Sequence, residues 1–551
     1  MCPPKSPARF RRRLLEAMAL AVFALPAPDA LALYGESMGR DFWTAVPRDG
    51  IGSVTMMITS SVDTTATIEA PGTGFSVTIA VPALGTSYVA IPSSLGMPND
   101  ETVRPWGIHV TSRDPVAVHM LLVAGASDDG YMVPPTCTYG NEYIAVTYAV
   151  TDGKGSTSMA LFVVVATEDG THVRITPSTA VVTAASTHPA GVPYTVNLSR
   201  GDVYLLRSEV MMGVPYFDPT GTVVSSSKPV TVISGSAVTP VPQFSCCADQ
   251  IYEQLLPVRQ WGREFITCPI PTRPGPDLFR IVASQDGTNV WRNGILKAVI
   301  NRGQFFEEIH DEPSVVTADK PVEVAQFSTG ADYDGTPGKY ADPYMSLVPA
   351  TSQYADDYLV PSGTPGGPFL GNHVMVTAPA SATGLVCVDG VPIPAGSFVP
   401  IPGIAYSVVT AAVSEGYHRV SGPAPFGLSL AGFYYYGSYG YPGGMRLTCG
   451  EAPPGGDGEE PVHVYPSPFR LRKAVGGTLK FDGLPDGSKV YIYAVTGREV
   501  RVLEGVKSHR LEWDGLNSEG KQAAAGIYLY LVDLRDGKTT KVIRGKIGLI
   551  R

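Results

Sequence analysis

The chain has 551 residues, which is enough for several domains, and it carries a formal net charge of −9. Apolar residues make up 44% and charged residues 17% of it, a mixture that can bury cores and therefore excludes general disorder. Its 60 glycines and 49 prolines are too many for a helical protein and are typical of short strands joined by many turns.

Residues 1–32 have the pattern of a secretory signal sequence. Basic residues begin it, an apolar run extends from Ala17 to Ala27, and Ala30-Leu31-Ala32 is a small-residue cleavage site. The apolar run is too short to span a bilayer, and we find no other stretch that is long enough. We therefore expect an extracellular or cell-surface protein without a transmembrane segment.

The remaining chain divides into an acidic body and a basic tail. Residues 1–32 hold five basic and two acidic residues and residues 462–551 hold 16 and 9, which leaves a net charge of −19 on residues 33–461. Such a negative body argues against a nucleic-acid partner. The basic tail could face an anionic cell envelope, although a solvated face is the simpler interpretation.

A five-residue pattern recurs four times at intervals of about a hundred residues. It reads aromatic, small, any, acidic, aromatic, with a fainter copy at 38–42. Repeats of this size predict four modules, and a pattern kept at every joint predicts buried aromatic side chains and an acidic side chain that accepts backbone N–H bonds. The repeated residues are Tyr139, Gly140, Glu142, Tyr143, Trp261, Gly262, Glu264, Phe265, Tyr354, Asp357 and Tyr358.

Further landmarks follow in the same order within the modules. Asp169-Gly170 and Asp286-Gly287 lie between β-branched runs and predict hairpins, because Asp and Gly tolerate the positive φ of tight turns. A later proline is expected at the first residue of a strand, where its missing N–H need not join the ladder. These prolines are Pro115, Pro229, Pro321 and Pro425.

The strand spacing predicts an all-β protein. Six or seven short strands at intervals of about 8–12 residues favour tandem antiparallel β-sandwich modules. A propeller is the alternative, but its blades of four strands need only roughly 40–50 residues, about half of each repeat. The expected domains are four β-sandwich modules, a Gly/Pro-rich linker and an immunoglobulin-like C-terminal sandwich, at 33–130, 131–251, 252–345, 346–449, 450–461 and 462–551.

Four strings in the body carry a family resemblance: Asp249–Pro257, Trp261–Phe265, Asp319–Val322 and Asp342–Met345. With them the body resembles the N-terminal domain of IgGFc-binding proteins, which are mucus-associated proteins of animals with many bacterial relatives. The resemblance implies an extracellular module for binding or adhesion without known catalysis. Its expected partner is an extracellular protein or glycan.

The tail carries strings of a different kind, which are Tyr465–Phe469, Val490–Tyr493, Trp513–Gly515 and Gly526–Tyr530. They resemble the FlgD-type immunoglobulin-like domain at the C-termini of bacterial surface proteins, and are also similar to the sorting domain of the type IX secretion route. Either resemblance implies a bacterial envelope or secreted protein. We therefore expect the body to bind and the tail to attach or sort.

Catalytic motifs are missing from the sequence. It has no Gly-x-Ser-x-Gly elbow, no His-Glu-x-x-His pair and no phosphate-binding glycine loop, so we predict no catalytic residues and no cofactor. A hydrolase whose residues meet only in space, and a structural envelope component, remain the alternatives. Asp332, Asp334 and Asp342 on a Gly-rich loop are a candidate calcium site, but a solvated turn is the favoured interpretation.

Six cysteines follow the signal sequence, and an even number in an exported chain predicts disulfides. We expect Cys387 to pair with Cys449, because both lie in the fourth module. The adjacent Cys246 and Cys247 should then take separate partners, which leaves Cys137 and Cys268. The run Tyr434–Tyr441 has the composition of an adaptable binding surface, but a strand with alternate tyrosines buried is favoured.

Overall fold

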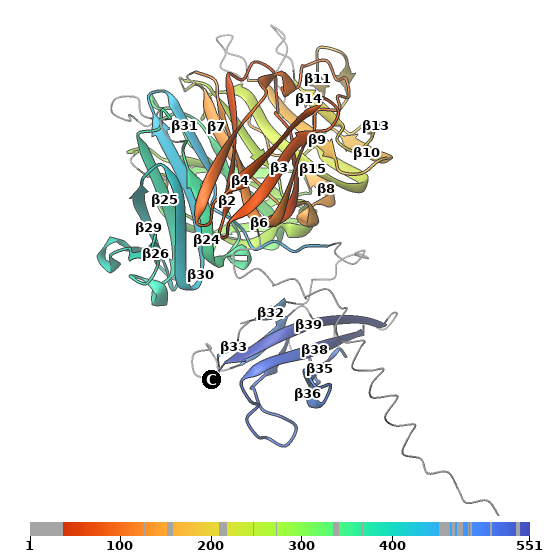
Figure 1. Cartoon of the computed structure of the whole chain (residues 1–551), viewed down its shortest axis with the longest axis vertical. Coiled ribbons are helices and arrows are strands. Elements are labelled where there is room, and N and C mark those ends of the chain that lie inside the picture. Colours follow the sequence, from red (N-terminus) through yellow and green to blue (C-terminus); the bar gives the residue numbers. More distant parts are fainter. Residues whose placement is uncertain are drawn as a thin grey trace, which may run out of the picture. The chain divides into compact units, whose positions relative to one another are not determined.

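The computed structural model divides the chain into two compact units, residues 1–450 and 451–551 (Figure 1). The described residues are 37–450 except 126, 151–157, 209–217, 246, 272, 334, 336–340 and 365–366, and 463–550 except 466–468, 471–477, 483, 485–486, 507–509 and 536–539. The predicted signal sequence and residues 451–461 of the predicted linker therefore lie outside the described part. No helix among the described residues is long and apolar enough to cross a membrane.

The first unit, called the body below, is all-β and consists of four antiparallel sheets in chain order, each curled into a sandwich-like module. Module 1 contains β1 (Gly39–Thr44), β2 (Ser53–Ser60), β3 (Thr64–Ala70), β4 (Phe75–Val81), β5 (Gly85–Ile91), β6 (Ile108–Val123) and β7 (Asp128–Val133). Module 2 contains β8 (Gly140–Ile144), β9 (Ala160–Ala166), β10 (Thr171–Thr176), β13 (Tyr194–Leu198), β14 (Val203–Arg207), β15 (Val223–Thr239) and β16 (Asp249–Gln254), with the small pair β11 (Val181–Val182) and β12 (Thr187–His188).

Modules 3 and 4 repeat this order. Module 3 contains β17 (Gly262–Thr267), β18 (Asp277–Ala283), β19 (Thr288–Arg292), β20 (Ile295–Ile300), β21 (Phe305–His310), β22 (Ser314–Phe327) and β23 (Met345–Leu347). Module 4 contains β24 (Ala355–Ser362), β25 (Gly371–Pro379), β26 (Cys387–Val388), β27 (Val391–Pro392), β28 (Val399–Pro400), β29 (Tyr406–Val413), β30 (Gly416–Tyr434) and β31 (Gly437–Pro442). Short 3₁₀ turns are η1 (Ser93–Leu95), η2 (Thr136–Thr138), η3 (Val258–Gln260), η5 (Thr351–Gln353), η6 (Ala380–Ala382) and η7 (Ala395–Ser397).

Each module is organised on one long strand, of 16 residues in β6, 17 in β15, 14 in β22 and 19 in β30. In module 1 the first half of β6 pairs with β1 and β3, and the second half with β2 and β7. The expectation that the landmark prolines begin strands is wrong, because Pro115 and its three equivalents lie inside these long strands. Their missing N–H is tolerated there because the register of the first strand shifts at that point, as between Gly39 and Asp41.

The Asp-Gly turns form, but they do not make hairpins. Gly170 and Gly287 have φ values of +65° and +61°, as the turn prediction requires. However, β9 and β10 are not neighbours in the sheet, whose order is β13-β10-β15-β9-β14. The turn instead joins a strand that pairs with one half of the long strand to a strand that pairs with its other half.

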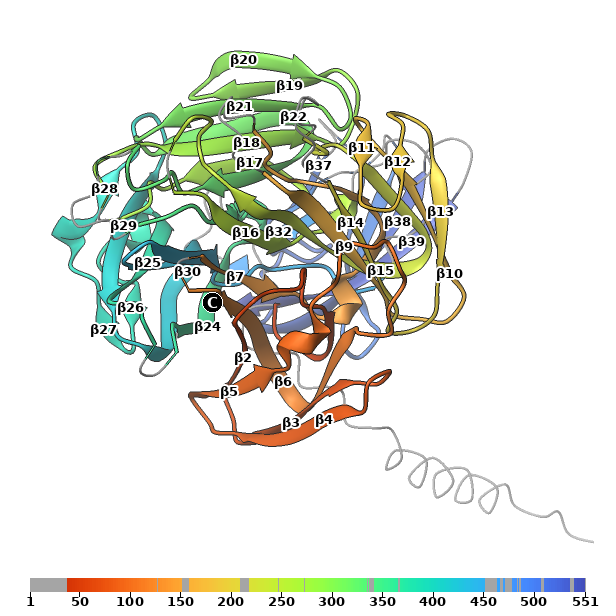
Figure 2. The ribbon, with the colours of Figure 1, turned by 90° about the horizontal axis from the view of Figure 1, so that it is seen from above.

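The four modules surround a common axis, which Figure 2 shows from above. The last strand of each module lies innermost, so that β7 contacts β16 and β31, and β23 contacts the same two strands. This radial order is that of a propeller, although each repeat adds a second half-sheet and so reaches twice the usual blade size. We call the end of the axis where these inner strands begin the upper end.

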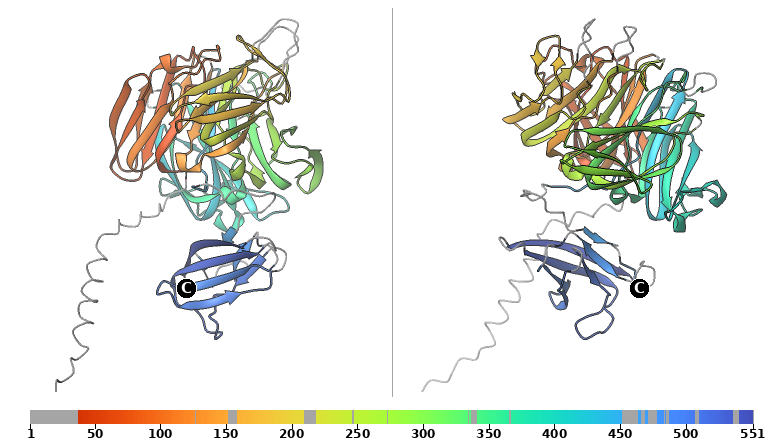
Figure 3. Two further views of the ribbon diagram at one scale, coloured as in Figure 1. Left: turned by 90° about the vertical axis from the view of Figure 1, so that its right-hand side faces the viewer. Right: turned by 180° about the vertical axis from the view of Figure 1, so that it is seen from behind.

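The C-terminal unit has two sheets, which both views of Figure 3 show. One contains β32 (His463–Tyr465), β34 (Leu479–Asp482) and β37 (Arg510–Trp513); the other contains β33 (Phe469–Arg470), β35 (Lys489–Ala494), β36 (Glu499–Leu503), β38 (Gly526–Arg535) and β39 (Thr540–Ile550). Trp513, Phe481 and Ile492 are fully buried between them. This unit therefore has a hydrophobic core of its own.

Candidate functional site: the axis of the module ring and its upper rim

Acidic and amide side chains line the axis of the body. Asp128 and Asp129 begin β7, Asp249 begins β16, and Glu253 lies further along the same strand. All four are at most 1% exposed. Buried groups of this kind need hydrogen-bond partners, and their partners explain how the ring is held together.

Asp129 is the hub of the axis. Its carboxylate accepts backbone N–H bonds from Gly130 of β7 at 2.7 Å, Tyr252 of β16 at 2.7 Å and Met345 of β23 at 3.4 Å, and also from Gly440 of β31. Each of the four inner strands thus gives one N–H to the same side chain. The inner strands form no ladder with one another among the described residues, so their inward N–H groups need such an acceptor.

Two neighbouring side chains of β16 extend this network. Glu253 Oε1 accepts the Leu347 N–H at 3.1 Å. Gln254 Nε2 donates to Trp43 O and the Tyr139 hydroxyl at 3.1 Å each. One strand of module 2 therefore holds modules 1 and 3 through side chains that have no contact with solvent.

Burial disfavours the ionised form of these carboxyls. It raises the pKa of Asp128 to about 7, and raises the pKa of Asp129, Asp249 and Glu253 well above the ordinary range. For Asp249 the nearby carboxyl of Asp342 acts in the same direction. The axis is thus an acid-rich core.

The candidate calcium residues do not gather in the described part of the chain. Asp342 is buried, Asp332 is exposed, and Asp334 lies outside the described residues. Among the residues that the structure does describe, no three His, Cys, Asp or Glu side chains are placed to hold a metal ion. The calcium hypothesis therefore gains no support.

The joint pattern lies in the first strand of each module, and its aromatic residues are buried. The Tyr143 hydroxyl accepts the Gly140 N–H at 3.2 Å and donates to Val230 O at 2.7 Å. Tyr358 makes the same two bonds in module 4, to Ala355 N and Phe426 O. The other buried members are Tyr139, Trp261, Phe265 and Tyr354.

The small residue of the pattern is required by the next module. A Cβ on Gly39 or Gly262 would overlap Pro135 or Ala350, which precede η2 and η5. A Cβ on Gly140 would meet Pro257 Cβ at 2.7 Å. Glycine therefore allows each module to approach the start of its successor closely.

The acidic residues of the pattern bind side chains, in contrast to the expected backbone N–H bonds. Two of the three join successive modules, so their role is again contact between modules. The pairs are Glu142–Arg302, Glu264–Thr351 at 3.0 Å and Asp357–Arg419 at 2.5 Å.

The lower end of the axis is closed by a strap, residues 443–450. Gln260 Nε2 of η3 donates to Thr448 O at 2.7 Å, and the Arg446 N–H donates to Gln353 O of η5 at 2.8 Å. The Gly450 N–H donates to Cys137 O of η2 at 2.8 Å. The strap therefore binds the 3₁₀ turns that open modules 2, 3 and 4.

The predicted Cys387–Cys449 disulfide is wrong. Cys449 at the end of the strap bonds to Cys137, 312 residues earlier in the chain, and Cys387 is a free thiol. The pairing of Cys137 with Cys246 or Cys247 is thereby excluded, and Cys268 is also a free thiol. Cys246 lies outside the described residues. The prediction failed because it assumed that Cys449 pairs within its own module, whereas the strap returns to module 2.

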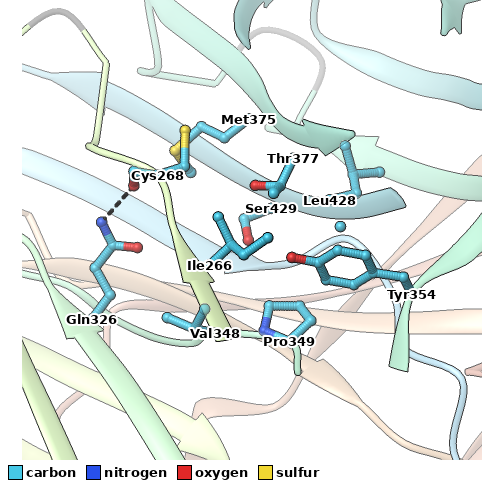
Figure 4. Close-up of a pocket in the computed structure, with 11 residues that line it drawn as sticks. Ile266, Cys268, Gln326, Val348, Pro349, Tyr354, Met375, Thr377, Leu428 and Ser429 are labelled. Atoms are coloured by element: carbon cyan, nitrogen blue, oxygen red, sulfur yellow. Dashed lines mark hydrogen bonds between the residues drawn. The ribbon is translucent and has the colours of Figure 1, made fainter. Parts of the chain in front are cut away.

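A small pocket lies between modules 3 and 4 (Figure 4). Ile266, Cys268, Tyr354 and Met375 line it, and Gln326 Nε2 donates to Cys268 O at 2.9 Å. Burial raises the pKa of the Cys268 thiol to about 12, so the thiolate that a nucleophile requires is not formed near neutral pH. The pocket therefore offers no cysteine chemistry.

The upper end of the axis differs, because aromatic side chains point into solvent there. They lie on the loops that lead into three inner strands: Phe244 is 70%, Tyr333 45% and Tyr435 55% exposed. We call these three residues the upper rim. Phe244 and Tyr436 have φ values of +70° and +50°, a conformation that bulky residues rarely adopt.

Hydrogen bonds connect the loops that carry the rim. The Gly330 N–H donates to Val241 O at 2.7 Å, which joins the loops before β23 and β16. The Tyr434 hydroxyl donates to Gly125 O in the loop before β7, and Ser438 Oγ donates to Asp342 O at 2.6 Å. The rim residues therefore lie on adjoining, mutually supported loops.

Sequence reasoning missed both Asp129 and the rim. The Asp128-Asp129 pair directly before an apolar strand was an available signal for the hub, because two carboxylates at a strand start need partners. The run Tyr434–Tyr441 is not one strand as predicted, because β30 ends at Tyr434 and β31 begins at Gly437, but the alternate tyrosines Tyr439 and Tyr441 of β31 are fully buried, as expected. Its exposed member, Tyr435, lies at the turn before β31.

A protein-family model described as "IgGFc binding protein" matches residues 129–432. The chain belongs to the IgGFc binding protein family. The matched stretch begins at Asp129 itself and ends inside β30, so it contains modules 2 and 3 completely.

Among curated proteins, the human IgGFc-binding protein is 27% identical over 308 residues, which are 55% of this chain and 5% of that relative. The chain thus spans a small part of the relative's length. Among solved structures, dimeric latent PorU of Porphyromonas gingivalis is 12% identical with a TM-score of 0.14, covering 50% of this chain and 30% of that one. PorZ, a surface component of the type-IX secretion system of the same organism, is 14% identical with a TM-score of 0.15, covering 86% and 63%. These TM-scores support no conclusion about fold or function.

Proposed function

We propose that this member of the IgGFc binding protein family is a non-catalytic, extracellular bacterial protein for binding or adhesion, and that its ligand is held at the upper rim. The observation that carries the proposal is the group of three exposed aromatic side chains on adjoining loops at one end of the axis. Exposed aromatic groups of this kind mark interaction sites more often than ordinary surface.

The backbone at the rim supports the same proposal. Holding Phe244 at φ +70° costs on the order of 1–3 kcal/mol, and folding gains little from burial of a side chain that is 70% exposed. Strain kept at an exposed aromatic residue is typical of a binding position. The loops are also linked by hydrogen bonds, so little ordering is lost when a ligand binds.

The composition of the rim favours recognition over catalysis. Asp128 and Asp249 are buried beneath the loops, whereas Asp332, directly before Tyr333, is exposed. Aromatic rings can stack on the apolar faces of sugars or anchor in a protein surface, so the ligand classes to test are glycans and proteins.

The test is a binding screen of the chain without residues 1–32 against a glycan array and against immobilised antibody Fc fragment. For any probe that binds, replacing Phe244, Tyr333 or Tyr435 by Ala should weaken binding about tenfold or more, since aromatic anchors contribute on the order of 2 kcal/mol. Leu84→Ala, at a residue that is 53% exposed on the β4–β5 turn, is the matched control. Binding that survives all three rim substitutions would move the site elsewhere.

We propose further that the C-terminal unit attaches or sorts the protein. Three features of the C-terminal unit support this proposal. Its sequence strings resemble those of bacterial surface domains, it has a core of its own, and it is positively charged whereas the body is acidic. Ending the chain at Gly458 should leave the melting temperature of the body unchanged and abolish retention on the cell surface, or export. Full retention by the truncated protein would refute this role.

A further inference from the structure

Two arginine side chains meet at the upper end of the body, at the junction of modules 1 and 2. Arg48 lies in the loop between β1 and β2, and Arg207 is the last residue of β14. Both guanidinium groups contact Asp49: Arg48 Nη1 donates to its backbone O at 2.9 Å, and Arg207 Nη1 lies 3.5 Å from its carboxylate Oδ1. Two positive groups are thus brought together in a region, residues 33–461, whose net charge is −19.

Some donors of this arginine pair have no acceptor in the part of the chain that the structure describes. Arg48 Nη2 donates to Gln250 Oε1 at 3.3 Å, but the Nε–H groups of Arg48 and Arg207 are both buried and both lack a hydrogen bond there. A guanidinium carries five N–H donors, and buried donors in folded proteins normally have partners. The missing acceptors must therefore come from solvent or from a ligand.

The hydroxyl of Tyr252 on β16 is a further donor at this place. It is fully buried and makes no regular hydrogen bond to any described residue. Burial raises the pKa of this hydroxyl, whereas the charges of Arg48 and Arg207 act in the opposite direction, so both guanidinium groups lie close to it. Tyr131 of β7 is different, because its buried hydroxyl donates to Ala45 O at 2.9 Å.

The carboxyl groups beside the arginines leave their positive charge largely uncompensated. Burial raises the pKa of Asp129, which faces Tyr252, well above the ordinary range, so this carboxyl holds its proton near neutral pH. Asp49 is 57% exposed, and its 3.5 Å distance from Arg207 exceeds the roughly 2.7–2.9 Å of a strong charge-assisted hydrogen bond. A loose surface pair of this kind contributes little and can be displaced.

We propose that Arg48 and Arg207 form a binding site for an oxyanion, which is the sulfate, phosphate or carboxylate group of an extracellular ligand. The parallel N–H donors of a guanidinium match the oxygens of such groups, and arginine is the residue that binds them in bidentate form. The Tyr252 hydroxyl adds a neutral donor. The arginine side chains are partly exposed, so a ligand can reach them from solvent. This inference concerns a site of its own and does not depend on the function proposed for the upper rim.

Titration of the chain without residues 1–32 with sodium sulfate tests the site directly. At constant ionic strength, balanced with sodium chloride, calorimetry should show binding with a Kd on the order of 1 mM, which is typical of a small ion held by a few hydrogen bonds. Sodium phosphate and sodium acetate are titrated in parallel. They distinguish a sulfate or phosphate group from a carboxylate group, and saturable binding of any of the three ions supports the site.

Three substitutions separate this site from general attraction of anions. Arg207→Gln should weaken binding of sulfate at least tenfold, because one guanidinium is lost. Arg113→Gln, at an exposed arginine that also pairs with an aspartate, is the matched control and should leave the affinity unchanged. Asp49→Asn removes the competing carboxylate and should tighten binding several-fold. Because Asp49 is exposed, this variant should keep the melting temperature of the wild type.

Three results would overturn the proposal. One is that none of the three ions binds the wild-type chain at concentrations up to about 20 mM, far above the expected Kd. Equal affinity in Arg207→Gln and Arg113→Gln would mean an adventitious ion only, bound elsewhere on the surface. Weaker binding in Asp49→Asn would contradict the role of Asp49 as a competitor. None of these results bears on the rim, whose test is the loss of ligand binding in the aromatic variants.

Discussion

The two ends of the ring axis are built in opposite ways. At the lower end the strap binds three 3₁₀ turns and ends in the Cys137–Cys449 disulfide, so its contacts serve closure of the ring. At the upper end aromatic side chains are exposed, and Phe244 holds a strained backbone. Hydrogen bonds join neighbouring modules at both ends, but the disulfide-closed strap lies at the lower end. The upper loops are thereby free to carry function on a rigid support.

The largest expected effect is at the hub between the two ends. Asp129→Ala should destabilise the body by on the order of 5 kcal/mol, because several buried N–H groups lose their acceptor at about 1–3 kcal/mol each. Denaturant unfolding measures this loss, with the exposed Asp356→Ala as control. A loss below about 1 kcal/mol would mean that the inner strands are held by apolar packing alone.

Breaking the strap tests the lower end. Cys449→Ser should lower the free energy of unfolding by up to about 5 kcal/mol, because the bond closes a loop of more than 300 residues in the unfolded chain. Thermal melting without reductant is the measurement, and Cys387→Ser, at a free thiol, should have no effect. Equal melting of the two variants would contradict the role of the strap. Ligand binding at the rim should survive in the folded fraction of Cys449→Ser.

The buried carboxyls beneath the rim predict a dependence of stability on pH. Because the pKa of Asp128 is raised to about 7 in the folded state, the group holds its proton longer when folded than when unfolded. Stability is therefore fully present below about pH 4 and is lost as pH rises through 7, by up to about 4 kcal/mol for a shift of this size. Asp128→Asn should match the wild type at pH 4 and be more stable at pH 8. Parallel stability curves of the two proteins would show that folding does not raise the pKa of Asp128.

The smallest effect concerns strain at the upper end. Phe244→Gly should raise the free energy of unfolding by about 1 kcal/mol, because it relieves strain on the order of 1–3 kcal/mol at φ +70°, while the greater freedom of glycine in the unfolded chain offsets roughly 0.5–1 kcal/mol. The same substitution should weaken ligand binding. Stability gained together with affinity lost is the signature of a functional position. A loss of both would instead make Phe244 a structural residue.

The sequence by itself determined the local properties of the modules. The spacing of short strands predicted an all-β chain, and the recurring joints predicted that Tyr143, Phe265 and Tyr358 are buried. Asp169-Gly170 correctly predicted a turn with positive φ at glycine. These properties follow from one short segment, because the burial of a strand face and the torsion of a turn are set by the residues in it.

Only the tertiary structure decided which segments meet. The Asp-Gly turns join strands that are not neighbours, Pro115 lies within a strand whose register shifts beside it, and Cys449 bonds to Cys137 across 312 residues. The hub at Asp129 has acceptor sites for four strands that lie in four modules. A sequence pattern indicates that a side chain needs a partner. Closure of the ring determines which partner it meets, because closure brings together residues hundreds of positions apart.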